Sequence, residues 1–286
     1  MCLGGSANLA QALIKDIREH GSEVLTGLET KRILFRRGRV AGIELAGGET
    51  IGAKAFVASG LNPQQTFLQL LDPDTVSSQV REKAAAFQFN TLAPLFALNL
   101  ALHEPPRFSG AQQRPELNKA FMVILGLERF AQFDEIVAAH ERGQIPGTVM
   151  WGACPTLFDP RKLKKRITAS LCSICWHDLR RTYITQHAVI DSFVQSPVDT
   201  ERALPNMKFG DLLVGSFANN QVGYNRPFPG AGEYRTPVRG LYLCGGSTHP
   251  GGNITGLCGY NAARVLAADL RLPVWWKPPQ LNLESL

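Results

Sequence analysis

A buried strand, a glycine-rich loop and a helix follow one another near the C-terminus, and this run constrains the fold most. The strand reads Gly240-LYLC-Gly245, and six of the chain's 27 glycines lie between Gly245 and Gly259. A helical pattern follows from Tyr260 to Leu270. Glycines let a ligand approach the backbone, and a helix N-terminus favours phosphate or a polarised oxygen. The run indicates either a nucleotide-binding turn or an ordinary strand–helix connection.

Composition sets the class of protein. The chain has 286 residues, of which 44% are hydrophobic, so it can bury a core and form about two domains. Its six cysteines follow no regular framework, which indicates reduced thiols and a cytoplasmic location. No apolar run approaches the ~18–20 residues that cross a bilayer. The double tryptophan at Trp275 and Trp276 is compatible with a peripheral membrane contact, although we favour packing on the body.

The net charge of +6 is concentrated in one segment. Residues 161–181 hold seven Lys and Arg and one Asp, which accounts for the whole excess. Nucleic-acid-binding surfaces spread their charge along a face, so we expect no nucleic-acid partner. The wider stretch 161–187 contains no glycine and differs from its surroundings. We interpret it as an insertion or as a damaged part of the reading frame.

Periodicity and turn residues predict a mixed α/β fold. A helix is expected over 4–20, followed by several strands and then by alternating elements. The predicted strands are Glu23–Leu25, Glu29–Arg36, Arg39–Leu45, Glu49–Ala58, Leu92–Leu102 and Thr148–Cys154. The predicted helices in the middle are Pro63–Leu71, Asp74–Phe87 and Leu127–Gly143.

Few residues outside the glycine-rich run point to chemistry. The chain has no GxGxxG, Walker or GxSxG motif. Cys172 and Cys175 have CxxC spacing with His177 nearby, but no second ligand pair matches, so we expect no metal site. His249 is either a loop histidine bonded to backbone or a proton donor beside a ligand, and we name it as the candidate catalytic residue.

Three stretches together resemble phytoene-desaturase-like flavoproteins. They are Gly4-GSANLAQA-Leu13 with the strands up to Gly60, Ser196-PVDTERAL-Pro205, and the long run Gly240–Leu266. Within that group the chain is most similar to the pyridine nucleotide-disulfide oxidoreductase domain 2-like proteins. The resemblance covers about residues 1–155 and 188–272 and skips the basic segment.

The resemblance implies an FAD-binding fold of the GR2 or amine-oxidase type with two domains. Residues 1–60 and 236–272 would form part of a discontinuous FAD domain. Residues 61–235 would form the substrate domain, and 273–286 a tail. The family's N-terminal Rossmann unit, which carries GxGxxG, has no counterpart here. The chain therefore resembles the C-terminal portion of that fold.

The resemblance also implies a set of cofactor-binding residues. Those beside the adenosine portion are Glu29, Thr30, Ala58, Ser59 and Gly60. Those beside the diphosphate, ribityl chain or flavin ring are Gly245, Gly246, Asn253 and Ile254. Gly256, Gly259 and Tyr260 would bring a helix N-terminus to the pyrimidine edge, where negative charge develops in reduced flavin.

Two functions follow from the resemblance. The first is an FAD-dependent oxidoreductase that moves hydride from an apolar small molecule to flavin, as in C–C desaturation or a related oxidation. The second is a non-catalytic fragment or subunit that needs a separate polypeptide carrying the Rossmann unit. The identity of the substrate, the electron acceptor and the oligomeric state are not specified by the sequence.

Overall fold

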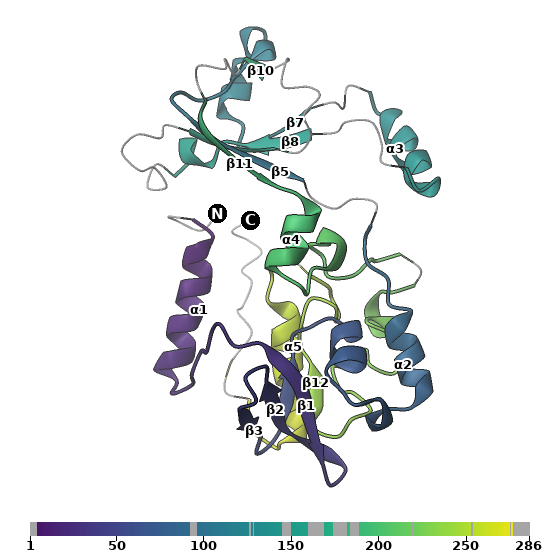
Figure 1. The fold of residues 1–286 in the computed structure, drawn as a ribbon. Coiled ribbons are helices and arrows are strands. Elements are labelled where there is room, and N and C mark those ends of the chain that lie inside the picture. Colours follow the sequence, from purple (N-terminus) through teal and green to yellow (C-terminus); the bar gives the residue numbers. More distant parts are fainter. Residues whose placement is uncertain are drawn as a thin grey trace. The chain divides into compact units, whose positions relative to one another are not determined.

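The computed structural model describes most of the chain. The described residues are 5–91, 96–125, 127, 129–144, 150–159, 169–173, 182–183, 189–218, 220–252, 254–274 and 276. They form two compact units, which we call unit 1 and unit 2. Unit 1 comprises residues 1–27, 91–205 and 209–211, and unit 2 comprises 28–90, 206–208 and 212–286. Figure 1 shows the elements of each.

Unit 2 holds two small sheets. An antiparallel sheet has the order β1-β2-β3, and a parallel pair joins β12 to β4. Arg37 and Gly38 connect β1 to β2 in a turn where both residues have positive φ, as the tight-turn signal predicts. The bounds are β1 Thr30–Arg36, β2 Arg39–Leu45, β3 Thr50–Gly52, β4 Val57–Ser59 and β12 Leu241–Leu243.

The core of unit 2 packs helical segments against both sheets. Its helices are η1 Gln65–Gln69 (a π-helix), α2 Ser78–Ala85 and α5 Leu257–Asp269. Phe67, Leu241 and Leu243 are at most 1% exposed in the main cluster, together with Ile33 and Val40 of the antiparallel sheet. Burial of these apolar side chains is the main source of stability in such a unit, and it places two residues of β12 in the core.

Unit 1 is built on one antiparallel sheet of five strands in the order β11-β5-β9-β8-β7. Its strands are β5 Ala97–Leu102, β7 Met122–Leu125, β8 Met150–Ala153, β9 Ala169–Ser173 and β11 Val189–Gln195. A second pair joins β6 Arg107–Phe108 to β10 Thr182–Tyr183. The helices are α1 Ala7–Glu19, α3 Gln132–Glu141 and α4 Pro197–Ala203.

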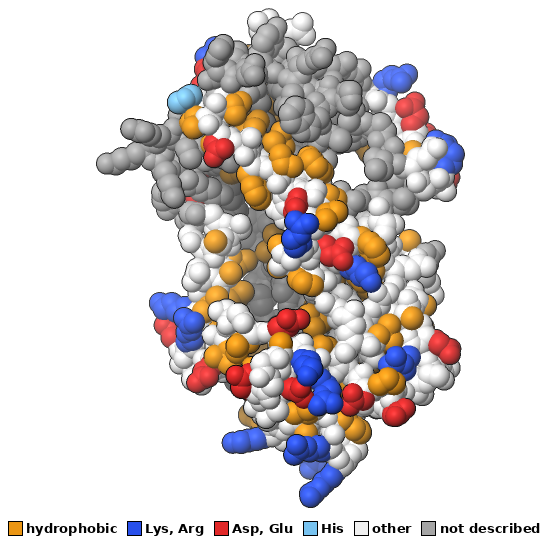
Figure 2. All heavy atoms as spheres, viewed as in Figure 1, with side chains coloured by type: hydrophobic (Ala, Val, Ile, Leu, Met, Phe, Trp, Pro, Cys, Tyr) orange, Lys and Arg blue, Asp and Glu red, His pale blue; other side chains and the backbone are white. Residues whose placement is uncertain are grey.

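The two faces of this five-stranded sheet differ. Leu98, Leu100 and Leu102 point to one face and form a buried cluster with Cys154. Strand register places Val123 opposite Gly152 on that same face. Because side chains alternate along a strand, Met122 and Ile124 lie on the other face. Figure 2 shows hydrophobic side chains at the surface of unit 1 near β11 and β5.

Most predicted elements are present, with four corrections. Residues Glu23–Leu25 are not a strand, and the strand expected over 49–58 is two separate strands, β3 and β4. Of the helix expected over Asp74–Phe87 only α2 is α-helical, and a separate 3-10 helix, Pro73–Thr75, precedes it across the extended residues Val76 and Ser77. The last helix, α5, begins at Leu257 instead of Tyr260, because Gly259 is helical and not part of the loop.

The basic segment 161–187 contributes two strands. β9 pairs with β5 on one side and β8 on the other, so this part of the segment belongs to the sheet. Cys175 and His177 lie outside the described residues, as do residues 92–95 of the predicted strand Leu92–Leu102. None of the helices within the described ranges combines the length and the apolar character needed to cross a bilayer.

Candidate functional site

The carboxyl ends of β4 and β12 meet at one edge of their parallel pair. Leu243 lies opposite Ser59, and the amide of Cys244 donates to the carbonyl oxygen of Ser59 at 2.9 Å. A glycine follows each strand: Gly60 comes directly after β4, and Gly245 comes two residues after β12. A Cβ on Gly245 would collide with the carbonyl oxygen of Gly60, so only glycine permits this approach. The structure therefore brings together the predicted groups 58–60 and 245–246.

Two asparagines fix the turn that follows β4. Asn62 is fully buried, and its amide N–H donates to Oδ1 of Asn206 at 2.6 Å. Asn206 Nδ2 donates in turn to the carbonyl oxygen of Gly60 at 3.2 Å. Burial and complete hydrogen bonding make this a rigid connection. Ser59 itself is buried, with its hydroxyl 2.8 Å from that of Thr66, so its side chain serves the fold.

The glycine-rich loop is tied to α5 through side chains. Thr248 Oγ1 donates to the carbonyl oxygen of Gly245 at 2.8 Å, and Cys258 Sγ donates to that of Gly251 at 3.3 Å. Ser247 is also completely buried, yet its Oγ has no hydrogen-bond partner within the described part of the chain. A buried hydroxyl without a partner is costly, and a ligand atom could supply one.

The N-terminus of α5 has no internal cap. Its N-cap residue is Gly256, with φ 68°, and no side chain caps it. The first turn contains no acidic residue. Among the described residues, no acceptor bonds the amides of Cys258 and Gly259. These amides and the positive end of the helix dipole are suited to an anionic or polarised oxygen.

Space is open at three of the predicted glycines. A Cβ on Gly60, Gly256 or Gly259 would meet nothing within 4 Å, so these positions border a surface that a ligand can approach. Ile254 is 84% exposed beside them in the sequence. The strand ends, the uncapped amides and the buried Ser247 hydroxyl together fit a phosphate-bearing or flavin-like group.

Arg226 is the main residue that sequence reasoning missed. Its side chain is fully buried, and its guanidinium lies 4.4 Å from the ring centroid of Phe217. It donates to the carbonyl oxygens of Leu213, Val214, Gly215, Ser216, Gln221, Gly246 and Thr248. A guanidinium has five N–H donors for these seven carbonyl oxygens, so some of its N–H groups are shared between two acceptors. It therefore holds the 213–221 segment against the glycine-rich loop.

His249 lines a cavity that none of the other predicted site residues lines. Its side chain is exposed and lines a cavity of about 310 Å³ with Tyr224, Glu233, Arg235 and Val265 among its walls. None of the predicted cofactor-binding glycines lines this cavity. Its backbone is held instead, since Tyr234 Oη donates to the His249 carbonyl oxygen at 2.8 Å. A catalytic role for His249 stays a prediction.

An ion pair and a tyrosine hydroxyl anchor the C-terminal part of α5 through Asp269. Arg235 donates to both carboxylate oxygens of Asp269 at 2.8 and 2.7 Å, and Tyr242 Oη donates to the same carboxylate at 2.9 Å. The hydrogen bonds from Arg235 lower the pKa of Asp269. Burial raises the pKa of the Cys244 thiol, which keeps it protonated and unreactive near neutral pH.

The remaining predicted residues are not gathered at the strand ends. Glu29 and Thr30 lie at the start of β1, in the antiparallel sheet. Asn253 lies outside the described residues. Tyr260 packs edge-on against Trp276 with ring centroids 6.3 Å apart, in agreement with packing of the tail on the body. Within the described ranges, no three His, Cys, Asp or Glu side chains form a metal-binding group.

Comparison with known proteins gives relatives that share this sequence over most of its length. A limonene dehydrogenase subunit from Castellaniella defragrans is 30% identical over 316 aligned residues, which cover 96% of this chain and 56% of that protein. Pyridine nucleotide-disulfide oxidoreductase domain-containing protein 2 of Rattus norvegicus and of Mus musculus are each 25% identical and covered to 51%. No family model matches.

The chain is thus similar to oxidoreductases, among them a limonene dehydrogenase subunit and the pyridine nucleotide-disulfide oxidoreductase domain-containing proteins. The predicted similarity to the domain 2 proteins is thus confirmed, and the similarity to phytoene desaturases stays a prediction. The chain spans about half the length of the curated relatives it matches. A solved oxidoreductase from Methanosarcina mazei shares the fold with a TM-score of 0.55 at 16% identity, over 92% of this chain and 54% of that one.

Proposed function

We propose that the chain contributes one part of the FAD site of a flavin-dependent oxidoreductase that oxidises an apolar small molecule. The observation that carries this proposal is the close approach of Gly60 and Gly245, which follow the paired parallel strands β4 and β12. It is supported by the uncapped N-terminus of α5. The relatedness to a limonene dehydrogenase and to pyridine nucleotide-disulfide oxidoreductases agrees with it.

The residues of the chain would act mainly by placing backbone groups. The absence of side chains at Gly60, Gly256 and Gly259 leaves the backbone accessible. The amides of Cys258 and Gly259 would donate to an oxygen that gains negative charge, and the helix dipole would add to that stabilisation. Ser247 would donate or accept one further hydrogen bond. When bound, FAD supplies the acceptor for hydride removed from the substrate.

The exposed face of the five-stranded sheet in unit 1 supports an apolar substrate. Met122, Ile124 and Phe193 are 48%, 55% and 60% exposed, and the register places all three on the same face. Covering such side chains with a hydrocarbon is favourable by about 25 cal/mol for each Å² removed from water. C–C desaturation, as in phytoene-desaturase-like enzymes, is the reaction that we propose for such a substrate in the cytoplasm.

A second candidate function is that of a subunit which binds FAD only with a separate polypeptide that carries a Rossmann unit. One relative is named as a subunit, and the chain spans about half the length of its relatives. One edge of β4 pairs with β12, and no described strand pairs with its other edge. A free edge of this kind accepts a further strand.

FAD titration of the full chain tests the proposal. The chain is titrated alone and together with the part of the limonene dehydrogenase relative that lies outside the match. Binding by the chain alone supports the first function, and binding only in the mixture supports the second. If FAD binds in neither arrangement, the proposal is wrong.

A matched pair of variants locates the bound cofactor. Gly259→Val places a side chain in the open space at the start of α5, and Ala263→Val makes a similar change at an exposed position one turn later. We expect Gly259→Val to weaken FAD binding at least about tenfold and Ala263→Val to change it less than about twofold. Equal effects of the two variants would place FAD elsewhere.

A further inference from the structure

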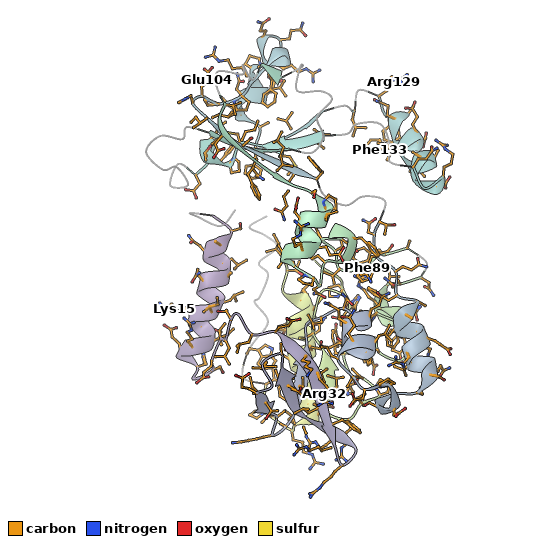
Figure 3. The ribbon with its side chains drawn as sticks, viewed as in Figure 1. Lys15, Arg32, Phe89, Glu104, Arg129 and Phe133 are labelled. Carbon is orange, nitrogen blue, oxygen red and sulfur yellow. The ribbon has the colours of Figure 1, made fainter. Side chains whose placement is uncertain are left out.

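Unit 1 contains a cavity of about 370 Å³ that no part of the proposed cofactor site touches. Its walls come from the loop and strand β6 around 104–108, the segment 117–123 that leads into β7, and residues 152–157 at the end of β8. Glu104, which lies at this cavity, is labelled in Figure 3. Cavities of roughly 300–1,000 Å³ are the usual size of small-molecule sites.

The cavity lies on the covered face of the five-stranded sheet. Val123 and Gly152 both line it, and they are opposite one another on the face that also carries the buried leucines of β5. Cys154, which belongs to that buried cluster, is a further wall. The neighbour of Val123 along the strand, Ile124, points to the opposite face. The cavity is therefore separate from the exposed sheet face that we assign to the substrate.

The walls are mainly apolar and carry no uncompensated charge. The charged residues of the lining are Glu104 and Arg107, which pair with each other at 2.9 Å. Cys154 is only 6% exposed, and its thiol lies 3.6 Å from the hydroxyl of Thr156. The apolar walls include Phe108, Leu117, Phe121, Val123 and Leu157.

Two of these apolar walls face water, and the ring of one of them is packed against a neighbouring ring. Phe121 and Leu157 are 43% and 45% exposed. The ring of Phe121 packs edge-on against Phe158, with centroids 5.2 Å apart. A preformed apolar wall binds without the entropic cost of ordering it, and a hydrocarbon ligand would remove its surface from water.

We propose that this cavity binds a small, uncharged, mainly hydrocarbon molecule. The charges of Glu104 and Arg107 offset one another, so the lining offers no net charge to an ionic head group, and a carboxylate or ammonium among its apolar walls would lose hydration. An uncharged hydrocarbon has no such hydration to lose on entering the cavity. The site is independent of the FAD proposal, since it lies wholly within unit 1.

Naphthalene is a suitable probe because it is uncharged, apolar and fluorescent, and naphthalene-1-carboxylate is its charged counterpart. Val123→Trp fills the cavity, whereas Val137→Trp adds the same side chain at an exposed position of α3 that lines neither the cavity nor the sheet face assigned to the substrate. We expect naphthalene to saturate the full chain, Val123→Trp to weaken its binding at least about tenfold, and Val137→Trp to change it less than about twofold. The carboxylate should bind at least about tenfold more weakly than naphthalene.

A chemical readout covers the case in which Val123→Trp does not fold. Bound naphthalene should slow the modification of Cys154 by iodoacetamide, measured by peptide mass spectrometry, and leave Cys244 of unit 2 unaffected. The absence of saturable naphthalene binding, equal effects of the two tryptophan variants, or unchanged modification of Cys154 would each overturn the proposal. FAD titration of the same variants is expected to be unchanged, which separates this site from the cofactor site.

Discussion

Gly245 lies directly against the carbonyl oxygen of Gly60, so the ends of the parallel strands β12 and β4 touch through backbone alone. This contact sets the spacing of the two turns that lead into the proposed FAD site. A methyl group at Gly245 has no room unless one strand end moves, and overpacking of this kind costs about 1–3 kcal/mol.

We therefore expect Gly245→Ala to lower the free energy of unfolding by about 1–3 kcal/mol and to weaken FAD binding. Gly52→Ala in β3 is the matched control, because a Cβ there meets nothing within 4 Å. Urea denaturation of both variants measures the difference. Equal stability of the two would mean that the strand ends adjust freely.

We expect a larger loss of stability when the buried guanidinium of Arg226 is removed. Arg226→Met removes the donors for backbone carbonyls in the 213–221 segment and in the glycine-rich loop. Each buried carbonyl that loses its partner costs about 1–3 kcal/mol, so we expect a loss of at least about 3 kcal/mol in unfolding free energy. Arg264→Met on the exposed face of α5 is the control and should change stability little. Thermal and urea unfolding measure both variants. An Arg226→Met chain that is as stable as the Arg264→Met control would contradict the expectation.

The local parts of this site were predictable, and its long-range parts were not. The apolar pattern of β12 and the glycines after it indicate a strand and a loop directly, and both are present. The start of α5 was placed three residues late because Gly259 is a poor helix former. Arg226 lies in a polar loop without periodicity, and its burial arises from carbonyls distant in the sequence. Nothing in the local pattern indicates such a role.

The pairing of β4 with β12 shows the same limit. Each strand has three residues, and the long chain between them carries no signal of their parallel register. The resemblance to flavoproteins suggested that residues 58–60 and 245–246 share a site, and the structure places them together. It leaves Glu29 and Thr30 in another sheet, so their role in binding adenosine stays a prediction. His249 likewise stays a candidate, with its side chain in a different cavity.

Asp269 predicts a pH dependence of stability. Its pKa is lowered in the folded chain, first by the hydrogen bonds from Arg235. The ionised form therefore stabilises the fold above the ordinary aspartate pKa of about 4, and this contribution is lost as the pH falls through the lower folded value. Arg235 is 45% exposed, so solvent screening limits the contribution to about 1 kcal/mol or less.

Asp269→Asn should accordingly be less stable than the parent chain at pH 7, and the difference should shrink as the pH falls below about 4. Urea denaturation at several pH values measures this. Asp74→Asn, a change at an exposed aspartate, serves as the control and should show no such difference. A difference for Asp269→Asn that persists at low pH would show that the carboxylate charge is not its source.

Ser247 and Thr248 are adjacent buried hydroxyls with opposite hydrogen-bonding states, and they predict opposite effects. Thr248 Oγ1 donates to Gly245, whereas Ser247 Oγ has no partner within the residues that the structure describes. Without FAD, Thr248→Val should lower the free energy of unfolding by about 1 kcal/mol, and Ser247→Ala should leave it equal or raise it by up to about 1 kcal/mol.

With FAD present, the Ser247→Ala substitution should become unfavourable. If its hydroxyl bonds the cofactor, Ser247→Ala loses that bond and binds FAD about fivefold more weakly, since one neutral hydrogen bond contributes about 1 kcal/mol. Urea denaturation with and without FAD measures the free energy of unfolding and the affinity for FAD on the same variant. A Ser247→Ala chain that is less stable without FAD and unchanged in FAD affinity would mean that this hydroxyl serves the fold, as that of Thr248 does, and takes no part in the site.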